Sequence, residues 1–133
     1  MLSRLVPAAM VRWFARPYVA GDSLDAGLDV AARIWSDRGL LATLDVLGEE
    51  VREKAKVDAN TRLYASVIEA LARDARFSDR PTRPSVSLKP SAFTAAGQEE
   101  AKGPIAELAA LARDKGVALT IDMEDRRWTD YPI

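Results

Sequence analysis

Residues 117–125, VALTIDMED, form an apolar run that ends in three acids within four positions. A short apolar run of this kind predicts a buried strand that brings carboxylates to its C-terminal end. Two earlier stretches have the same form, each with a charged residue near its exit: residues 40–49, LLATLDVLGE, and residues 85–91, SVSLKPS. Segments long enough to be helices separate the three runs, so the pattern predicts an α/β protein with the order βαβαβ.

Successive side chains of a strand point to opposite faces, and this alternation is consistent across the three runs. One face carries small, polar or charged residues: Thr43, Asp45, Ser87, Lys89, Thr120 and Asp122. The other face carries apolar residues: Ala42, Leu44, Val46, Val86, Leu88, Leu119, Ile121 and Met123. Helices would cover the apolar face, and the polar face would line the interior of a (β/α)8 barrel, whose active sites lie at the C-terminal ends of the strands. An open doubly wound sheet would be apolar on both faces.

The length of the chain limits how much of a barrel it can form. A complete (β/α)8 barrel takes about 250 residues, whereas this chain has 133. We therefore expect a partial barrel, with leading helices over residues 1–39 and the first three βα units over residues 40–133, incomplete in this chain.

Composition excludes several classes of chemistry. The net charge of −1 indicates neither nucleic acid nor an acidic membrane surface as a partner. Cysteine and histidine are both absent. Disulfides, thiol nucleophiles, the usual zinc sites and a histidine base are thereby excluded, which leaves carboxylates, amines or a bound cofactor.

Helical spacing predicts three helices before the second strand. Residues 1–16 predict a leading amphipathic helix, with an organelle-targeting or membrane-surface segment as the alternative. Ser23 is the expected N-cap of a helix that ends at Gly39. The core-facing residues of that helix are expected to be Leu24, Leu28, Ala31 and Trp35. A helix over residues 52–73 is expected to bury Ala59, Leu63, Val67, Ala70 and Leu71.

Prolines shape the rest of the chain. Residues 77–84, FSDRPTRP, predict an extended connector whose charges are exposed to solvent. Gly103 and Pro104 interrupt any earlier helix, so Pro104 is expected in the first turn of a helix that ends at Gly116. The apolar face of that helix is Ile105, Leu108, Ala109 and Ala112.

Lys89 and Asp122 are the strongest candidate site residues. They share the inward face near the exits of consecutive strands, which lie about 4.8 Å apart, so a salt bridge between them is geometrically reasonable. Two interpretations stay open: an ion pair that only fills the barrel mouth, or charges placed for a ligand. Asp45 has the same parity and either acts directly or bonds to backbone or a lysine.

Other polar and aromatic residues near the strand exits have simpler interpretations. Glu49 is expected to brace the loop after the first strand. Asp122, Glu124 and Asp125 indicate no metal site, because no further oxygen ligand is signalled. Trp128 and Tyr131 are expected to be core residues.

The motifs of the three strands resemble a known family. TLDVLGE, VSLK and LTIDMED, in that order and at these separations, are similar to the first three barrel strands of the FAD-dependent proline dehydrogenases. Residues 18–39, YVAGDSLDAGLDVAARIWSDRG, resemble the helix that leads into that barrel. The sequence departs from the family pattern at Pro90, where leucine is more usual, and in the loop 91–97.

The resemblance implies a function for the named residues. The implied reaction is oxidation of L-proline to 1-pyrroline-5-carboxylate, with hydride transfer to FAD. A quinone or another electron acceptor is implied as a partner. Lys89 would lie near the proline carboxylate with Asp122 as its ionic partner, and Asp122 and Met123 would lie at the cofactor. The lack of a GxGxxG motif is consistent with FAD, since the family is understood to hold the flavin over the barrel mouth.

The resemblance also implies partners and a location. The remaining C-terminal part of the barrel, in the same or a second chain, would complete the site. The protein would be cytoplasmic, or peripheral at the inner membrane. The alternative is a non-catalytic, barrel-derived α/β domain with a binding or scaffold role.

Overall fold

The computed structural model describes residues 20–21, 23–48, 51–124 and 128 of the chain. The helix expected within residues 1–16 lies outside this part. The helices are α2 (Leu24–Arg38), α3 (Lys54–Arg73) and α4 (Gln98–Lys115), and the strands are β1 (Thr43–Asp45), β2 (Ser85–Leu88) and β3 (Leu119–Ile121). Three 3-10 helices connect them: η1 (Ala75–Phe77), η2 (Arg80–Thr82) and η3 (Pro90–Phe93). In this part of the chain, no helix is both long and apolar enough to cross a membrane.

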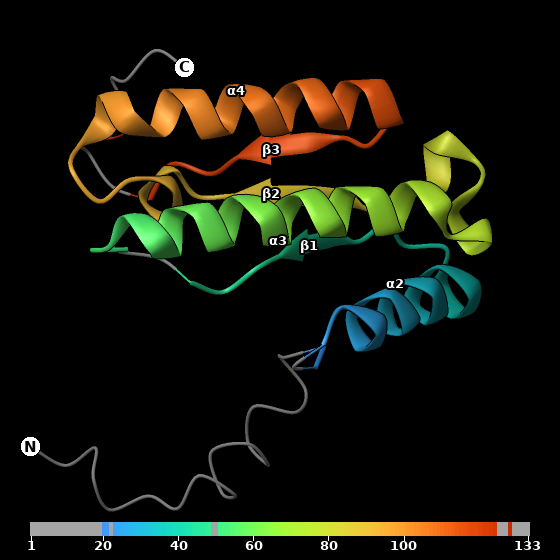
Figure 1. Ribbon diagram of the computed structural model, residues 1–133. Helices are drawn as coiled ribbons and strands as arrows, with labels where there is room; N and C mark the ends of the chain where they lie inside the picture. Colours follow the sequence, from blue (N-terminus) through green and yellow to red (C-terminus); the bar gives the residue numbers. More distant parts are fainter. Residues whose placement is uncertain (1–19, 22, 49–50, 125–127, 129–133) are drawn as a thin grey trace, which may run out of the picture.

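The three strands form one parallel sheet in the order β1-β2-β3, which confirms the predicted βαβαβ arrangement. Helices α3 and α4 pack against each other and cover one face of the sheet (Figure 1). The carboxyl ends of the strands therefore lie on the same side as the amino ends of α3 and α4.

The register of the sheet confirms the predicted division of faces. Leu44, Val86 and Leu119 occupy one row. Val86 is fully buried, and the other two pack against the core. Asp45, Ser87 and Thr120 occupy the next row, on the opposite face. The core between sheet and helices is completed by a common set of buried side chains, chiefly Tyr64, Ile68, Leu71, Leu88, Phe93, Ile105 and Leu108.

The strands are shorter than the apolar runs that predicted them. β2 ends at Leu88, because Pro90 has no N–H to donate and begins η3. Met123, expected on the covered apolar face, is 43% exposed. It lies beyond the end of β3, where the sheet no longer holds it against the helices.

Helix α2 has the predicted ends. The Ser23 hydroxyl accepts a hydrogen bond of 3.3 Å from the Ala26 N–H, and Gly39 adopts the left-handed conformation (φ 63°) that glycine favours. Leu28 and Ala31 are buried as predicted. The prediction for Trp35 was wrong, because its side chain is exposed and lies outside the core cluster.

Helix α3 buries Val67 and Leu71 as predicted, but the rest of its buried stripe differs from the predicted one. Ala59 and Leu63 face solvent, whereas Val57, Tyr64 and Ile68 are buried. The ring of Tyr64 makes an edge-on contact with Phe93, with 5.1 Å between the centroids. This contact turns the tyrosine face of the helix, about 100° from Leu63, towards the core.

Helix α4 starts earlier than predicted and runs through Pro104. Pro104 lies at the seventh helical position rather than in the first turn. Thr94 and Glu100 hold the residues before the helix, so the amino-terminal turn is already fixed before the proline. Ile105, Leu108 and Ala112 are buried as predicted, whereas Ala109 is exposed. Ala101, which precedes the predicted start of the helix, is also buried.

The connector before β2 is more structured than predicted. It contains η2, and Phe77 is buried. The charged group of Arg83, which was predicted to face solvent, makes hydrogen bonds to the protein instead. The Arg83 guanidinium donates to the carbonyls of Phe77 (3.1 Å), Lys115 (2.8 Å) and Gly116 (3.0 Å). Arg83 therefore satisfies carbonyls at the carboxyl end of α4, where a cation is favoured.

Candidate active site

The polar face of the sheet places the candidate residues in successive rows. Asp45, Ser87 and Thr120 form the last row within the strands. Lys89 and Asp122 follow two residues later, each directly after the end of its strand (β2 and β3), and the extended backbone of Lys89 (φ −110°, ψ 127°) preserves the alternation. The predicted residues are thus brought together at the carboxyl end of the sheet.

Lys89 lies between two carboxylates. Its Nζ atom is 2.6 Å from Asp45 Oδ2 and 3.8 Å from Asp122 Oδ2. The predicted neighbour Asp122 is therefore present, but the hydrogen-bonded partner is Asp45. The side-chain exposures are 17% for Lys89, 37% for Asp45 and 54% for Asp122, so the ammonium is the most enclosed of the three charged groups.

The closer contact with Asp45 follows from the direction of the lysine side chain. Asp45 belongs to the row before Lys89, and strand side chains lean along the strand as well as away from the sheet. The sequence indicated the shared face of Asp45 but not how far the lysine stem would reach. The resulting arrangement is a cation held by two acids, which can present positive charge to an anionic ligand.

The strand exits are tied together by residues that the sequence did not single out. The amide of Asn60 in α3 donates to the carbonyl of Ala92 at 2.9 Å and to that of Gly48 at 3.4 Å. The hydroxyl of Tyr64 donates to the Val46 carbonyl at 3.3 Å. These bonds hold the backbone after β1 and β2 against α3, close to Asp45 and Lys89.

Glu124 joins the exits of β2 and β3. Its carboxylate accepts from the N–H of Ser91 at 3.0 Å and from the Ser91 hydroxyl at 2.7 Å. Ser91 follows Lys89 by two residues, and Glu124 follows Asp122 by two. The polar contacts therefore continue one step beyond the Lys89 row.

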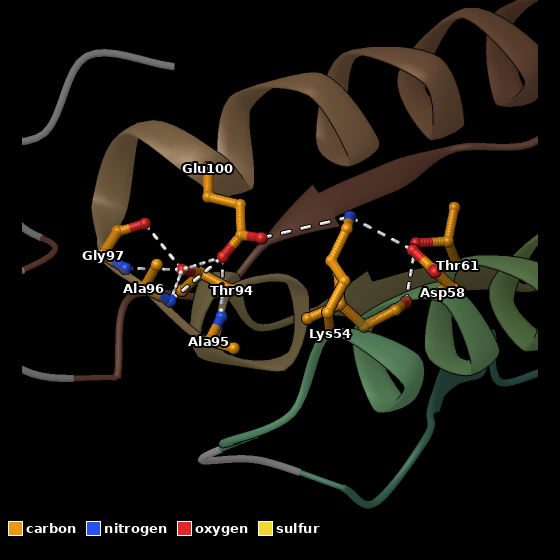
Figure 2. A network of polar contacts seen from close by, with 9 residues as sticks. Lys54, Asp58, Thr61, Thr94, Ala95, Ala96, Gly97 and Glu100 are labelled. Carbon is orange, nitrogen blue, oxygen red and sulfur yellow. Dashed lines mark hydrogen bonds and ion pairs between the residues drawn. The ribbon is translucent and has the colours of Figure 1, made fainter.

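The loop before α4 is fixed by a second polar network (Figure 2). The Glu100 carboxylate accepts from the N–H groups of Ala95 (2.8 Å) and Ala96 (3.0 Å). Hydrogen bonds to its carboxylate, first from the backbone of Ala95, lower the pKa of Glu100. The Lys54 ammonium lies 3.1 Å from Asp58 and 3.9 Å from Glu100, so α3 and α4 are linked through it.

A cavity of about 650 Å³ opens beside this loop, also near the carboxyl ends of the strands. It is lined by Val51, Arg52, Ser91, Thr94, Ala95, Gly97, Gln98 and Trp128. Neither Lys89 nor Asp122 lines it, so the charged cluster stands on the polar face of the sheet rather than in this cavity.

The remaining predicted residues divide into two groups. Trp128 is buried in the core cluster, as predicted. Glu49, Asp125 and Tyr131 lie outside the described residues. Within residues 20–21, 23–48, 51–124 and 128, no cluster of three or more acidic side chains is arranged to hold a metal ion.

Together these features define a class of protein. A parallel sheet with one helix-covered apolar face, one polar face and charges at the carboxyl ends of its strands is the arrangement of part of a (β/α)8 barrel.

Comparisons with known proteins give the family. The sequence model described as proline dehydrogenase matches residues 29–133, so the chain belongs to the proline dehydrogenase family. It is 30% identical over 127 residues to proline dehydrogenase 1 of Bacillus subtilis subsp. natto, covering 93% of this chain and 39% of that protein. It is likewise 30% identical over 125 residues to proline dehydrogenase 1 of Bacillus subtilis strain 168, with the same coverage. The chain thus spans about two fifths of the length of these curated relatives.

A solved structure supports the fold. The crystal structure of proline utilization A (PutA) from Bdellovibrio bacteriovorus, inactivated by N-propargylglycine, matches with a TM-score of 0.75 at 24% identity. The match covers 87% of this chain and 14% of that one.

Proposed function

We propose that the protein forms part of an FAD-dependent proline dehydrogenase, which oxidises L-proline to 1-pyrroline-5-carboxylate in proline catabolism. The observation that carries the proposal is the Lys89 ammonium held between Asp45 and Asp122 at the carboxyl end of the sheet. Family membership supports the choice of reaction. The proposal divides the chain as predicted, into leading helices over residues 1–39 and the first three βα units over residues 40–133.

Lys89 would bind the carboxylate of the substrate. L-proline is a zwitterion with an anionic carboxylate and a cationic secondary amine. Asp45 holds the ammonium at 2.6 Å, which fixes its direction. Asp122, which is further away and more exposed, has capacity left for a second cation, so it would face the positive end of the substrate or the cofactor.

The residues present fit a flavin at this edge in one respect. Met123, an exposed apolar side chain, directly follows Asp122, so apolar and acidic groups are both accessible beyond β3. Asp122 and Met123 are the residues that we propose contact the cofactor. FAD, when bound, accepts the hydride, and the residues of this chain bind and orient the substrate.

The complete enzyme requires further partners. We propose that the remaining C-terminal part of the barrel, in this chain or a second one, supplies the other strands, and that a quinone or another acceptor takes the electrons. The cytoplasmic location and the peripheral contact with the inner membrane stay predictions.

The proposal can be tested in the completed protein. This chain is joined to the remaining C-terminal part of the barrel, fused or in trans, and purified with excess FAD. We expect a yellow protein that reduces a dye acceptor with L-proline. A folded but colourless protein that remains inactive would favour the scaffold alternative.

Substitution of Lys89 then tests the site. Lys89→Met keeps the length of the stem and removes the charge, so we expect a steep fall in kcat/KM for L-proline with FAD retained. Lys102→Met, on the surface of α4 beside Glu99, is the matched control and should leave the kinetics unchanged. Unchanged proline kinetics in Lys89→Met would show that the ion cluster only fills the barrel mouth.

A further inference from the structure

The hydrogen-bonded ladder between β2 and β3 stops at the candidate site. The N–H of Val86 donates to the Ala118 carbonyl at 2.9 Å, and the N–H of Asp122 donates to the Leu88 carbonyl at 2.8 Å. In a parallel ladder, the groups that face one neighbouring strand recur every second residue. After Val86 and Leu88, the next donor from this strand to β3 would be residue 90. Pro90 has no N–H, so this ladder bond cannot form.

The Glu124 side chain accepts a hydrogen bond next to the missing ladder bond. The N–H of Ser91 is the first backbone donor after the proline, and it donates to Glu124 Oε2 at 3.0 Å. The Ser91 hydroxyl donates to Glu124 Oε1 at 2.7 Å. Both carboxylate oxygens of Glu124 therefore accept hydrogen bonds from Ser91. The side chains of Glu124 and Ser91 are both half-buried. A side-chain carboxylate here replaces a backbone carbonyl as the acceptor across the two strands.

Lys89 lies in the short segment between the last ladder bond and the contact of Ser91 with Glu124. The segment begins at Leu88, whose carbonyl makes the last ladder bond, and ends at Ser91. On the other side, the contacts are the 3.5 Å bond from the Val51 N–H to the Ser91 carbonyl and the Asn60 bond to Ala92. Glu124 thus ties residues 89–91 to the exit of β3, and hence to Asp122.

We propose that Glu124 is a positioning residue, which acts through Ser91 to hold Lys89 between Asp45 and Asp122 in place of the ladder bond that Pro90 cannot make. As far as catalysis is concerned, the inference rests on the function proposed above. Glu124 is not assigned any contact with the substrate. Its effect is on where the lysine ammonium meets the substrate carboxylate.

The first test measures proline kinetics in the completed, FAD-loaded protein. Glu124→Gln keeps the shape of the side chain but removes its charge, so both charge-assisted bonds with Ser91 are replaced by bonds to a neutral amide. We expect KM for L-proline to rise about tenfold with FAD content unchanged, the size expected for one lost hydrogen bond to a charged group. Ser91→Ala keeps the backbone bond and should raise KM less. Glu99→Gln, an exposed glutamate on α4, is the control and should have no effect.

The second test asks whether Glu124 compensates for Pro90. Pro90→Leu restores an N–H at residue 90, so the ladder bond can form again. In that background, Glu124→Gln should raise KM by less than about threefold. The restored ladder bond of residue 90 would then hold the segment together with the contact between Ser91 and residue 124. The same rise in KM in both backgrounds would overturn the proposal, as would an unchanged KM in folded Glu124→Gln enzyme.

Failure of the proposed function can be told apart from failure of the inference. If the unsubstituted protein binds no FAD and oxidises no proline, the proposed function fails, and hydrogen exchange of the Ser91 amide decides the inference. That amide should then exchange at least about tenfold faster in Glu124→Gln than in the unsubstituted protein. Equal exchange rates would overturn it. If Glu124→Gln does not fold, Ser91→Ala provides the same comparison, with a smaller increase in exchange expected and equal rates again overturning the proposal.

Discussion

Lys89 should be coupled more strongly to Asp45 than to Asp122, and a pair of double-mutant cycles in the completed protein measures the difference. Asp45→Ala and Asp122→Ala are made singly and together with Lys89→Met. The free energy of unfolding of each variant is determined by urea titration. The coupling energy of each pair is the part of the double-mutant effect that the single effects do not add up to.

The geometry sets the expected magnitudes. The Asp45 contact is a charge-assisted hydrogen bond of 2.6 Å to an ammonium that is 17% exposed. Such bonds contribute about 1.5–3 kcal/mol. The 37% exposure of Asp45 reduces this to about 1 kcal/mol. The Asp122 contact of 3.8 Å is too long for a hydrogen bond, and its carboxylate is 54% exposed, so about 0.3 kcal/mol is expected.

The dependence of each coupling energy on salt, and comparison with a surface ion pair, distinguish the Asp45 contact from the Asp122 contact. Raising the ionic strength from about 0.1 to 1 M shortens the Debye length from roughly 10 to 3 Å, which should remove the Asp122 coupling and leave most of the Asp45 coupling. The exposed Glu99–Lys102 pair on α4, 3.2 Å apart, serves as the reference for a surface ion pair. An Asp122 coupling equal to or larger than the Asp45 coupling would refute the reasoning from distance and exposure.

Three further predictions concern the rest of the chain. The 133-residue chain alone should associate, bind no FAD tightly and oxidise no proline, because the described part exposes leucines within residues 40–47 and the edges of an open sheet. A chain that is monomeric in gel filtration, contains FAD and reduces a dye with proline would contradict this. Tyr64→Phe should lower the free energy of unfolding by about 1 kcal/mol through loss of the bond to Val46, and Tyr64→Ala by about 3–5 kcal/mol through the cavity it leaves; equal losses in urea titration would contradict the separation of the two effects. The pKa of Glu100 is lowered in the folded protein, first by the hydrogen bond from Ala95, so its contribution to stability is complete above the ordinary carboxyl range and is lost as pH falls through the lowered pKa; Glu100→Gln should weaken this acid dependence of the melting temperature, and an unchanged pH profile would argue against it.

Alternation along the strands predicted the faces of the sheet, because a period of two residues leaves no freedom once a run is a strand. Alternation could not predict how far a long side chain extends from its own row of the sheet. Lys89 bonds to Asp45 in the preceding row, and Glu124 reaches Ser91 beyond a proline. Both contacts depend on the direction of long side chains in three dimensions, for which spacing along the sequence contains no information.

Helix faces were harder to predict than strand faces. Apolar residues surround much of α3, so Leu63 and Tyr64 offered competing stripes about 100° apart. The choice is made by Phe93, which lies about 30 residues later and meets the tyrosine ring. In the same way, Arg83 makes structural hydrogen bonds because the carbonyls at the end of α4 lack donors, and the local sequence of the connector does not reveal this.

The order β1-β2-β3 has a consequence for how the chain folds during synthesis. Each strand pairs with the one made just before it, Thr43 with Ser85 and Val86 with Leu119. A ribosome adds about 5–20 residues per second, so successive strands emerge seconds apart, whereas a helix forms in about a microsecond. Each new strand therefore has its pairing partner already synthesised, and no strand has to wait for a distant segment. During each interval, the growing edge of the sheet is exposed, but one of its faces carries hydroxyl, ammonium and carboxylate groups. A nascent chain with this polarity should be less prone to aggregation than one whose sheet is apolar on both sides, and pulse-labelling of stalled ribosome complexes can follow its stepwise growth.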